Sequence, residues 1–201
     1  MEQNLYKLTK RHKILNIKLF KFMKNLKQII QLFCFLGILT YSNVMANEEA
    51  NYEIIDRNDI YEIRKYSNRL AVETMTSGID SNFRKLFNYI SGRNDTEEKI
   101  KMTTPVTQVE KNGNMSMQFY LPSKFNLENV PNPSREDVKI INIEGGYYAA
   151  LRYSGRASDG NFLKHKKILE NALQKTIVSI ISPPIRATYD SPFTLPMNRR
   201  N

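Results

Sequence analysis

The chain has 201 residues, and its apolar (41%) and charged (25%) fractions are ordinary for a globular protein with one sizeable core. The net charge of +10 suggests nucleic acid or anionic lipid as a partner, but eight of the 30 basic residues and one of the 20 acidic residues lie within residues 1–46. The rest of the chain carries only about +3, so nucleic acid is excluded as a predicted partner.

Residues 1–46 are typical of a secretory signal peptide. Four lysines precede an apolar run at Ile29–Tyr41, and the Val-Met-Ala sequence at 44–46 supplies a plausible cleavage site. The run is short of the roughly 20 residues that span a bilayer, so we predict cleavage before Asn47 and no stable membrane span afterwards. An uncleaved anchor is the alternative, and Met23 is a possible true start.

This leader predicts an exported protein, periplasmic or secreted. The single cysteine, Cys34, lies inside the apolar run, so the mature chain contains no cysteine. Disulfides, thiol catalysis and Cys-ligated metals are then excluded together. Residues 47–201 are predicted to form one domain, and the sequence does not determine its oligomeric state.

The first predicted elements of this domain are two strands and a helix. Tyr52–Ile55 and Tyr61–Tyr66 have strand composition and flank a polar turn. Apolar residues at i, i+3, i+4 and i+7 then predict a helix, with Ser81 or Asn82 as its N-cap and Gly92 as its stop. The apolar face of this helix holds Phe83, Leu86, Phe87 and Ile90.

The middle of the chain predicts two strands joined by a tight turn. Lys99–Gln108 combines alternating apolar residues, paired threonines and Pro105, which predicts a strand edge with an exit fixed by proline. The Asn-Gly pair at 112–113 predicts a hairpin turn, because both residues tolerate positive φ. Residues 115–121 then alternate apolar and polar side chains, as in a half-buried strand.

The second half of the domain predicts a hairpin, a helix and an extended tail. Val138–Ile143 and Tyr147–Tyr153 are strand-like and flank a Gly-Gly pair. A helix is predicted from Asn161 to about Ile177. The tail at Ser182–Pro196 is rich in proline and aromatic residues, which indicates an extended segment laid over the body.

One pattern occurs twice along the domain. A strand ends at Ser77-Gly78 and a helix begins near Asn82-Phe83; the same order recurs at Ser154-Gly155 and Asn161-Phe162. Chance recurrence of common residues is the alternative. The ordered match favours an α+β fold made of duplicated strand–helix–strand units.

Catalytic motifs are missing from the sequence. It has no Gly-rich phosphate loop, no nucleophile elbow and no metal-ligand spacing, so we predict neither an enzyme nor a metal site. A hydrolase would need a carboxylate inside a cleft, and the strand carboxylates Glu62 and Glu73 are interpreted as solvent-facing. After cleavage, His165 is the only histidine, and a lone histidine of this kind is usually a half-exposed surface residue.

A series of short motifs resembles one known family. Lys99–Val106 is similar to the K-I-x-M-T-x-P-V signature of the SOUL haem-binding family. The resemblance extends over roughly Tyr52–Asn201. Its other motifs, in order, are Tyr61–Tyr66 (Y-E-x-R-x-Y), Phe83–Gly92 with the turn Arg93–Asp95, Pro131–Ile140, Tyr189–Pro192 (Y-x-x-P) and Asn198–Asn201 (R-R-N).

The resemblance implies a twisted, barrel-like antiparallel sheet flanked by two helices, and non-catalytic binding of haem or a related tetrapyrrole. The implied pocket lies on the first helix and near the C-terminal tyrosine, with an apolar slot for the macrocycle and cations for its propionates. The alternative is ordinary core and solvated charge. The candidate haem-binding residues are Leu86, Phe87, Ile90, Tyr189, Arg84 and Lys85.

Three positions depart from the family pattern. Lys65 stands where some relatives have a proposed histidine axial ligand, while Asp80 and Asn88 stand where relatives have basic pocket residues. We therefore expect haem to be held without a strong axial ligand. The alternative function is a binding module for another apolar small ligand, on the same scaffold but with haem binding lost.

Overall fold

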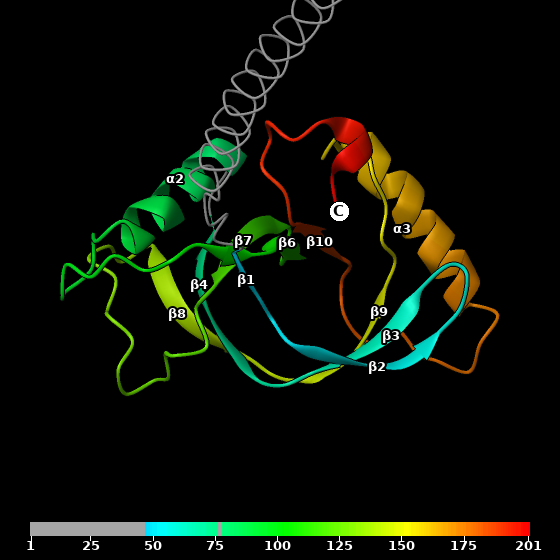
Figure 1. Cartoon of the computed structure of the whole chain (residues 1–201), viewed down its shortest axis with the longest axis horizontal. Coiled ribbons are helices and arrows are strands. Elements are labelled where there is room, and N and C mark those ends of the chain that lie inside the picture. The colour runs from blue at the N-terminus through cyan, green and yellow to red at the C-terminus, as the bar shows by residue number, and fades with distance from the viewer. Residues whose placement is uncertain (1–46, 76–77) are drawn as a thin grey trace, which may run out of the picture. The chain divides into compact units, whose positions relative to one another are not determined.

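The computed structural model describes residues 47–75 and 78–201, so the predicted signal peptide lies outside the described residues. The described part is an α+β domain with two helices, as predicted (Figure 1). Its helices are α2 (Ile79–Ile90) and α3 (Asp159–Leu173), and its strands are β1 (Glu48–Glu49), β2 (Tyr52–Arg57), β3 (Glu62–Tyr66), β4 (Arg69–Met75), β5 (Thr103–Thr104), β6 (Val106–Lys111), β7 (Asn114–Tyr120), β8 (Val138–Ile143), β9 (Gly146–Ala150) and β10 (Ile185–Thr188).

These strands form three sheets rather than the one barrel-like sheet that was expected. A five-stranded antiparallel sheet has the order β10-β6-β7-β4-β8, and a three-stranded antiparallel sheet has the order β2-β3-β9. Strands β1 and β5 form a short parallel pair. The predicted hairpin turn between β6 and β7 is confirmed, with φ of 52° at Asn112 and 78° at Gly113.

The two larger sheets meet at a corner where two chain segments bend together. Strand β3 continues into β4 across residues 67–68, and β8 continues into β9 across residues 144–145. On one side of the corner Tyr66 pairs with Gly146, and on the other Arg69 pairs with Ile143. At the bend the side chain of Asn68 accepts a hydrogen bond from the Gly145 N–H at 2.7 Å, and a Cβ at Gly145 would lie 2.5 Å from a backbone oxygen.

This corner explains two wrong predictions. The β8–β9 segment is not a hairpin, because each strand pairs with the opposite arm of the bent β3–β4 segment. The ladder of backbone hydrogen bonds is interrupted at the bend, which separates one continuous sheet into two.

Helix α2 covers strands β4 and β7 of the five-stranded sheet. It begins at Gly78, which caps it without a side-chain hydrogen bond, rather than at Ser81 or Asn82. The Asn82 side chain is buried and donates to the Met115 carbonyl at 3.4 Å, so it is turned toward β7 instead of toward the helix end. The helix ends just before Gly92, where φ is +106°, as predicted.

Helix α3 is shorter than predicted and much less buried. The Ser158 side chain accepts the Asn161 N–H at its start, and the helix ends at Leu173, its one fully buried residue. The chain leaves the helix there because the Thr176 hydroxyl bonds the Leu173 carbonyl at 2.7 Å and three β-branched residues follow. In the described part of the chain, neither helix is long and apolar enough to cross a membrane.

The C-terminal tail doubles back on the body of the domain. After β10, the Tyr189 N–H bonds the Arg200 carbonyl, and Tyr153 and Asn201 exchange two backbone hydrogen bonds of 3.2 and 3.0 Å. The tail is therefore mostly extended and packed on the domain, as its composition predicted, with one short 3-10 turn at Pro196–Asn198.

Candidate functional site

An exposed apolar surface lies on the outer flank of α2. Ile79, Phe83 and Phe87 recur every four residues, so they form a stripe beside the buried stripe of the helix. The hydrogen bond from Asn82 to the Met115 carbonyl brings the start of β7 against the same part of the helix. We call this the α2 apolar surface; its members, each between 41% and 49% exposed, are Ile79, Phe83, Phe87 and Met115.

Two stacked rings form the centre of this surface. The Phe83 and Phe87 rings have centroids 6.0 Å apart and planes 13° from parallel. The Phe83 ring also meets the buried Phe119 ring edge-on at 5.2 Å, so it is anchored to the core. Both rings keep a large part of their surface exposed, so the pair offers accessible aromatic surface to an apolar ligand.

The other two apolar candidates on α2 belong to the core. Leu86 is fully buried and Ile90 is 5% exposed, both in the cluster that includes Val72 and Phe119. They hold α2 on the sheet and have little surface left for a ligand. Of the three apolar residues predicted on this helix, Phe87 alone is accessible.

The two basic candidates point in different directions around α2. The Lys85 ammonium is 2.7 Å from the Asp137 carboxylate, and it is largely buried. Hydrogen bonds from Arg135 and then Lys85 hold the pKa of Asp137 well below its usual range. Arg84 is three residues from Phe87, on the same flank, and it forms no ion pair among residues 47–75 and 78–201.

Beyond α2, strands β6 and β10 continue the same sheet face. Thr188 pairs with Val106, and Val106 pairs with Phe119, so all three side chains point to the side that carries α2. Val106 and Thr188 are only half-buried. Figure 1 shows β6 and β10 between α2 and α3. We call this region the β6–β10 platform.

Helix α3 approaches the far edge of this platform through Arg186. The register places Arg186 opposite Gln108 on β6. Its guanidinium lies over the Phe162 ring at 4.6 Å and bonds Asp159 at 2.7 Å, both at the start of α3. The platform is therefore bordered by Phe83 of α2 on one side and Phe162 of α3 on the other.

Tyr189 lies at the end of β10, among aromatic and basic side chains of other elements. The Arg200 guanidinium is 5.1 Å from its ring centroid. The nearby Tyr66 raises the pKa of the Tyr189 hydroxyl and Arg64 lowers it, but both effects are smaller than that of burial. Burial raises the pKa of Tyr189 to about 12, so its phenol is protonated at neutral pH.

The carboxylate Glu73 was interpreted as solvent-facing, and this was wrong. It is 8% exposed, and its Oε1 accepts from Lys111 and Ser116 at 2.5 Å and from Gln118 at 2.8 Å. Burial alone would raise the pKa of Glu73, but the hydrogen bonds from Gln118, Lys111 and Ser116 outweigh it and lower that pKa. Such a carboxylate is held ionised by structural partners.

The sequence carried a signal for this network that was missed. Glu73 pairs directly with Gln118 across the β4–β7 ladder, and Ser116 is two residues away on the same face. Polar side chains on one face of β7 lie beside a carboxylate on the paired strand, and they form a buried hydrogen-bond network once that face of the sheet is covered. The predicted half-buried strand is in fact buried on both faces from Ser116 to Tyr120.

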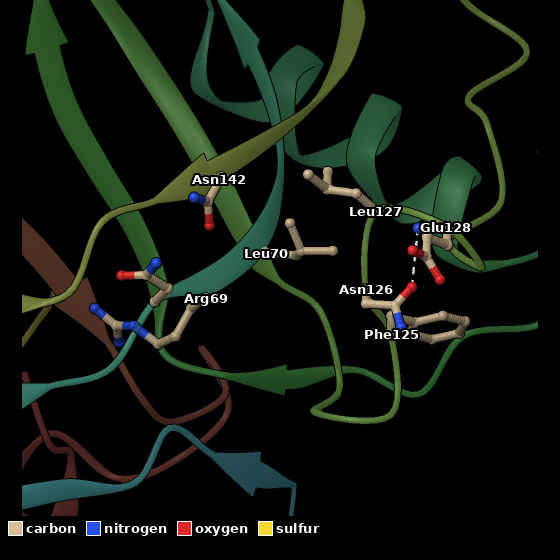
Figure 2. Close-up of a pocket in the computed structure, with 8 residues that line it drawn as sticks. Arg69, Leu70, Phe125, Asn126, Leu127, Glu128 and Asn142 are labelled. Atoms are coloured by element: carbon tan, nitrogen blue, oxygen red, sulfur yellow. Dashed lines mark hydrogen bonds between the residues drawn. The ribbon is translucent and has the colours of Figure 1, made fainter.

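The hollow in Figure 2 does not suit a large apolar ring. It has a volume of about 430 Å³ and is widely open to solvent. Most of its lining is polar, and it contains none of the predicted site residues. The residues around it are Asn68, Arg69, Leu70, Phe125, Asn126, Leu127, Glu128 and Asn142.

His165 is engaged by a neighbour on α3 and by the chain that follows β9. Its ring stacks on Tyr153 with centroids 4.0 Å apart, and its Nδ1 lies 2.8 Å from the Asn161 carbonyl. That contact requires the proton on Nδ1. Over the described ranges, no three His, Cys, Asp or Glu side chains cluster as a metal site would require.

Comparison with known proteins identifies the family. The family model described as "SOUL heme-binding protein" matches residues 47–201. The chain belongs to this family. It is 33% identical to Heme-binding protein 2 of Homo sapiens over 163 residues, which is 70% of this chain and 75% of the human protein. It is 33% identical to Heme-binding protein 2 of Mus musculus over 179 residues, 78% and 82% of the two chains.

A solved structure described as SAV2435 bound to tetraphenylphosphonium also matches part of this SOUL-family chain. The TM-score is 0.40 and the sequence identity is 10%, over 70% of this chain and 89% of the other. A likeness this weak carries no argument about function.

Proposed function

We propose that this SOUL-family protein binds haem or a related tetrapyrrole, without catalysis, on the α2 apolar surface and the adjoining β6–β10 platform. The observation that carries the proposal is the exposed, stacked Phe83–Phe87 pair with Arg84 beside it. Family membership and two relatives named as heme-binding proteins support the ligand class.

The residues of this region fit the two ends of such a ligand. The Phe83 and Phe87 rings offer an aromatic face for the macrocycle, and half-buried Val106 continues the apolar surface onto the platform. The Arg84 guanidinium is free to pair with a propionate, whereas Lys85 is occupied by Asp137. Leu86 and Ile90 act indirectly, by fixing α2 on the sheet.

The donor set for iron is poor. Lys65 is exposed, and a lysine ammonium has hydrogen-bond donors but no lone pair for a metal. The Tyr189 phenol is protonated because of its raised pKa. The binding is therefore mainly apolar, and bound iron would supply its own redox chemistry without a strong protein ligand.

The same surface supports the second candidate function, a binding module for another apolar small ligand. An aromatic face with one cation is not specific to tetrapyrroles. The departures from the family pattern at Lys65 and Asn88 raise this candidate, whereas family membership favours the first.

Three finer proposals accompany the main one. The leader at 1–46 exports the protein to a periplasmic or extracellular location. The domain arose from a duplicated unit, since β4 leads into α2 and β9 leads into α3 with Phe83 and Phe162 near the two helix starts. The domain acts without catalysis, in keeping with a strand carboxylate, Glu73, that is held by three structural hydrogen bonds.

The test is a haemin titration of the domain, followed by absorption in the Soret region. The Phe83→Ser, Phe87→Ser double variant should lose most of the binding. Phe193→Ser is the matched control, because Phe193 is 95% exposed and lies on the tail. Equal binding by all three proteins would refute the site. Absence of any Soret shift in the unaltered protein would favour the second candidate.

A further inference from the structure

The segment that joins α3 to β10 exposes an aliphatic cluster. Ile177 and Ile181 are 103% and 96% exposed, and Val178 and Ile180 between them are about half exposed. We call residues 177–181 the aliphatic loop. Contiguous apolar side chains this accessible mark an interaction surface rather than scattered surface residues. We propose that the aliphatic loop and the neighbouring lysines dock the protein on an anionic lipid surface.

The local sequence keeps this loop out of the sheet. Two prolines, Pro183 and Pro184, follow it after Ser182, and neither has an N–H to donate to a strand ladder. Pairing of β10 with β6 begins only at Ile185, opposite Val109. The aliphatic residues therefore do not continue β10, and their side chains remain exposed. Figure 1 shows the chain between α3 and β10 as a loop without strand structure.

The net charge of the domain is concentrated in the same part of the chain. Residues 159–186 hold five basic and two acidic residues, a net charge of +3, which equals the net charge of residues 47–201. Two of these basic residues are paired: Lys166 with Glu170 at 3.7 Å and Arg186 with Asp159 at 2.7 Å.

The remaining three basic residues account for the whole net charge of +3 in residues 159–186. Lys164, Lys167 and Lys175 are exposed and form no ion pair within the described part of the chain. Lys164 and Lys167 lie on the outer side of α3, and Lys175 lies two residues before Ile177. The segment from α3 to the aliphatic loop therefore combines free positive charge with exposed aliphatic side chains.

This chemistry fits lipid better than a protein partner. Protein interfaces are enriched in aromatic residues and arginine and depleted in lysine, whereas this surface has isoleucine, valine and lysine. Aliphatic side chains enter the acyl boundary of a bilayer, while lysines reach the headgroups with their flexible stems. The docking is peripheral, because no helix within the described residues could span the bilayer.

Vesicle co-sedimentation tests the proposal. Residues 47–201 form one compact unit that holds the described core, so they are used without the leader. They should bind phosphatidylcholine vesicles containing phosphatidylserine, bind pure phosphatidylcholine weakly, and detach as salt is raised. Ile177→Ser with Ile181→Ser should weaken binding roughly tenfold, and Phe193→Ser, on an equally exposed residue of the tail, should not.

The lysines are tested separately from the aliphatic residues. Changing Lys164, Lys167 and Lys175 to Gln should abolish the preference for anionic vesicles, while the same change at the exposed Lys99, Lys101 and Lys139 should not. Equal loss in both triple variants would overturn the proposal, because net charge alone would then explain the binding.

A tryptophan reporter tests whether the loop itself enters the bilayer. The chain contains no tryptophan, so Ile181→Trp gives a single reporter and Phe193→Trp a matched one. Emission from position 181 should shift to the blue on anionic vesicles and be quenched by brominated acyl chains. An unshifted emission would overturn insertion. Concentration-dependent self-association that Ile177→Ser and Ile181→Ser abolish would instead assign the loop to a contact between copies.

Discussion

The Phe83 and Phe87 rings stack on the solvent side of α2, with centroids 6.0 Å apart, while Leu86 between them points into the core and is fully buried. Two faces of the same helix therefore have different roles. The buried stripe holds the helix on the sheet, and the exposed stripe offers an aromatic face whose removal should cost the fold little.

The first prediction separates these two roles by mutation. Phe87→Ala should lower the free energy of unfolding by only about 1 kcal/mol, since half of the ring is exposed, but should weaken haemin binding. Leu86→Ala should cost roughly 3 kcal/mol, because it leaves a cavity in the core. Urea unfolding and haemin titration of both variants measure the difference. A loss of about 3 kcal/mol in Phe87→Ala would contradict the open site.

The second prediction concerns the two neighbouring cations. Arg84→Ala should weaken haemin binding and flatten its dependence on salt, because the free guanidinium is available to a propionate. Lys85→Ala should leave haemin binding nearly unchanged, because Lys85 is paired with Asp137. Titrations at two salt concentrations compare them. The reverse order of effects would mean that the Lys85–Asp137 pair opens for the ligand.

The third prediction concerns the iron. His165→Ala should leave haemin affinity close to that of the unaltered protein, roughly micromolar or about −8 kcal/mol, since stacking on Tyr153 and the contact with Asn161 already engage this ring. The spectrum of the complex should lack the bands of bis-histidine haem. If the single change abolishes the Soret shift, His165 is the axial ligand and the mechanism without a strong ligand is wrong.

The fourth prediction uses the pH dependence of stability. The pKa of Glu73 is lowered in the folded state, so ionised Glu73 stabilises the fold at neutral pH, and this contribution disappears as pH falls through the lowered pKa. Glu73→Gln should cost roughly 2–3 kcal/mol at pH 7 and progressively less in acid. Denaturant unfolding of both proteins at several pH values measures the gap. A gap that is constant with pH would contradict an ionised Glu73.

The fifth prediction concerns export. If residues 1–46 are a signal peptide, the protein recovered after secretion should begin at Asn47. N-terminal sequencing of the soluble protein measures this directly. Soluble protein that retains the lysines at 24 and 27 and the apolar run after them would contradict cleavage.

The sequence by itself determined the elements whose causes are local. The 3.6-residue period placed α2, and the Asn-Gly pair placed the β6–β7 turn. Strand composition around a polar turn placed β2 and β3, and the alternating run placed β7. The motif series from Tyr61 to Asn201 also identified the family, which the family model then matched over residues 47–201. These features depend on side-chain periodicity and backbone preference, which neighbouring residues decide.

Only the tertiary structure decided which strands pair and which side chains are buried or engaged by distant residues. The pairing of β8 with β4 required the corner at Asn68 and Gly145, which no local pattern encodes. The burial of Glu73 required β7 beside it, and the separation of Arg84 from Lys85 required Asp137 on one flank of α2. A helix period gives several equivalent flanks and a strand period gives two equivalent faces. Which of them is buried is set by the elements that pack against them, and those come from distant parts of the chain.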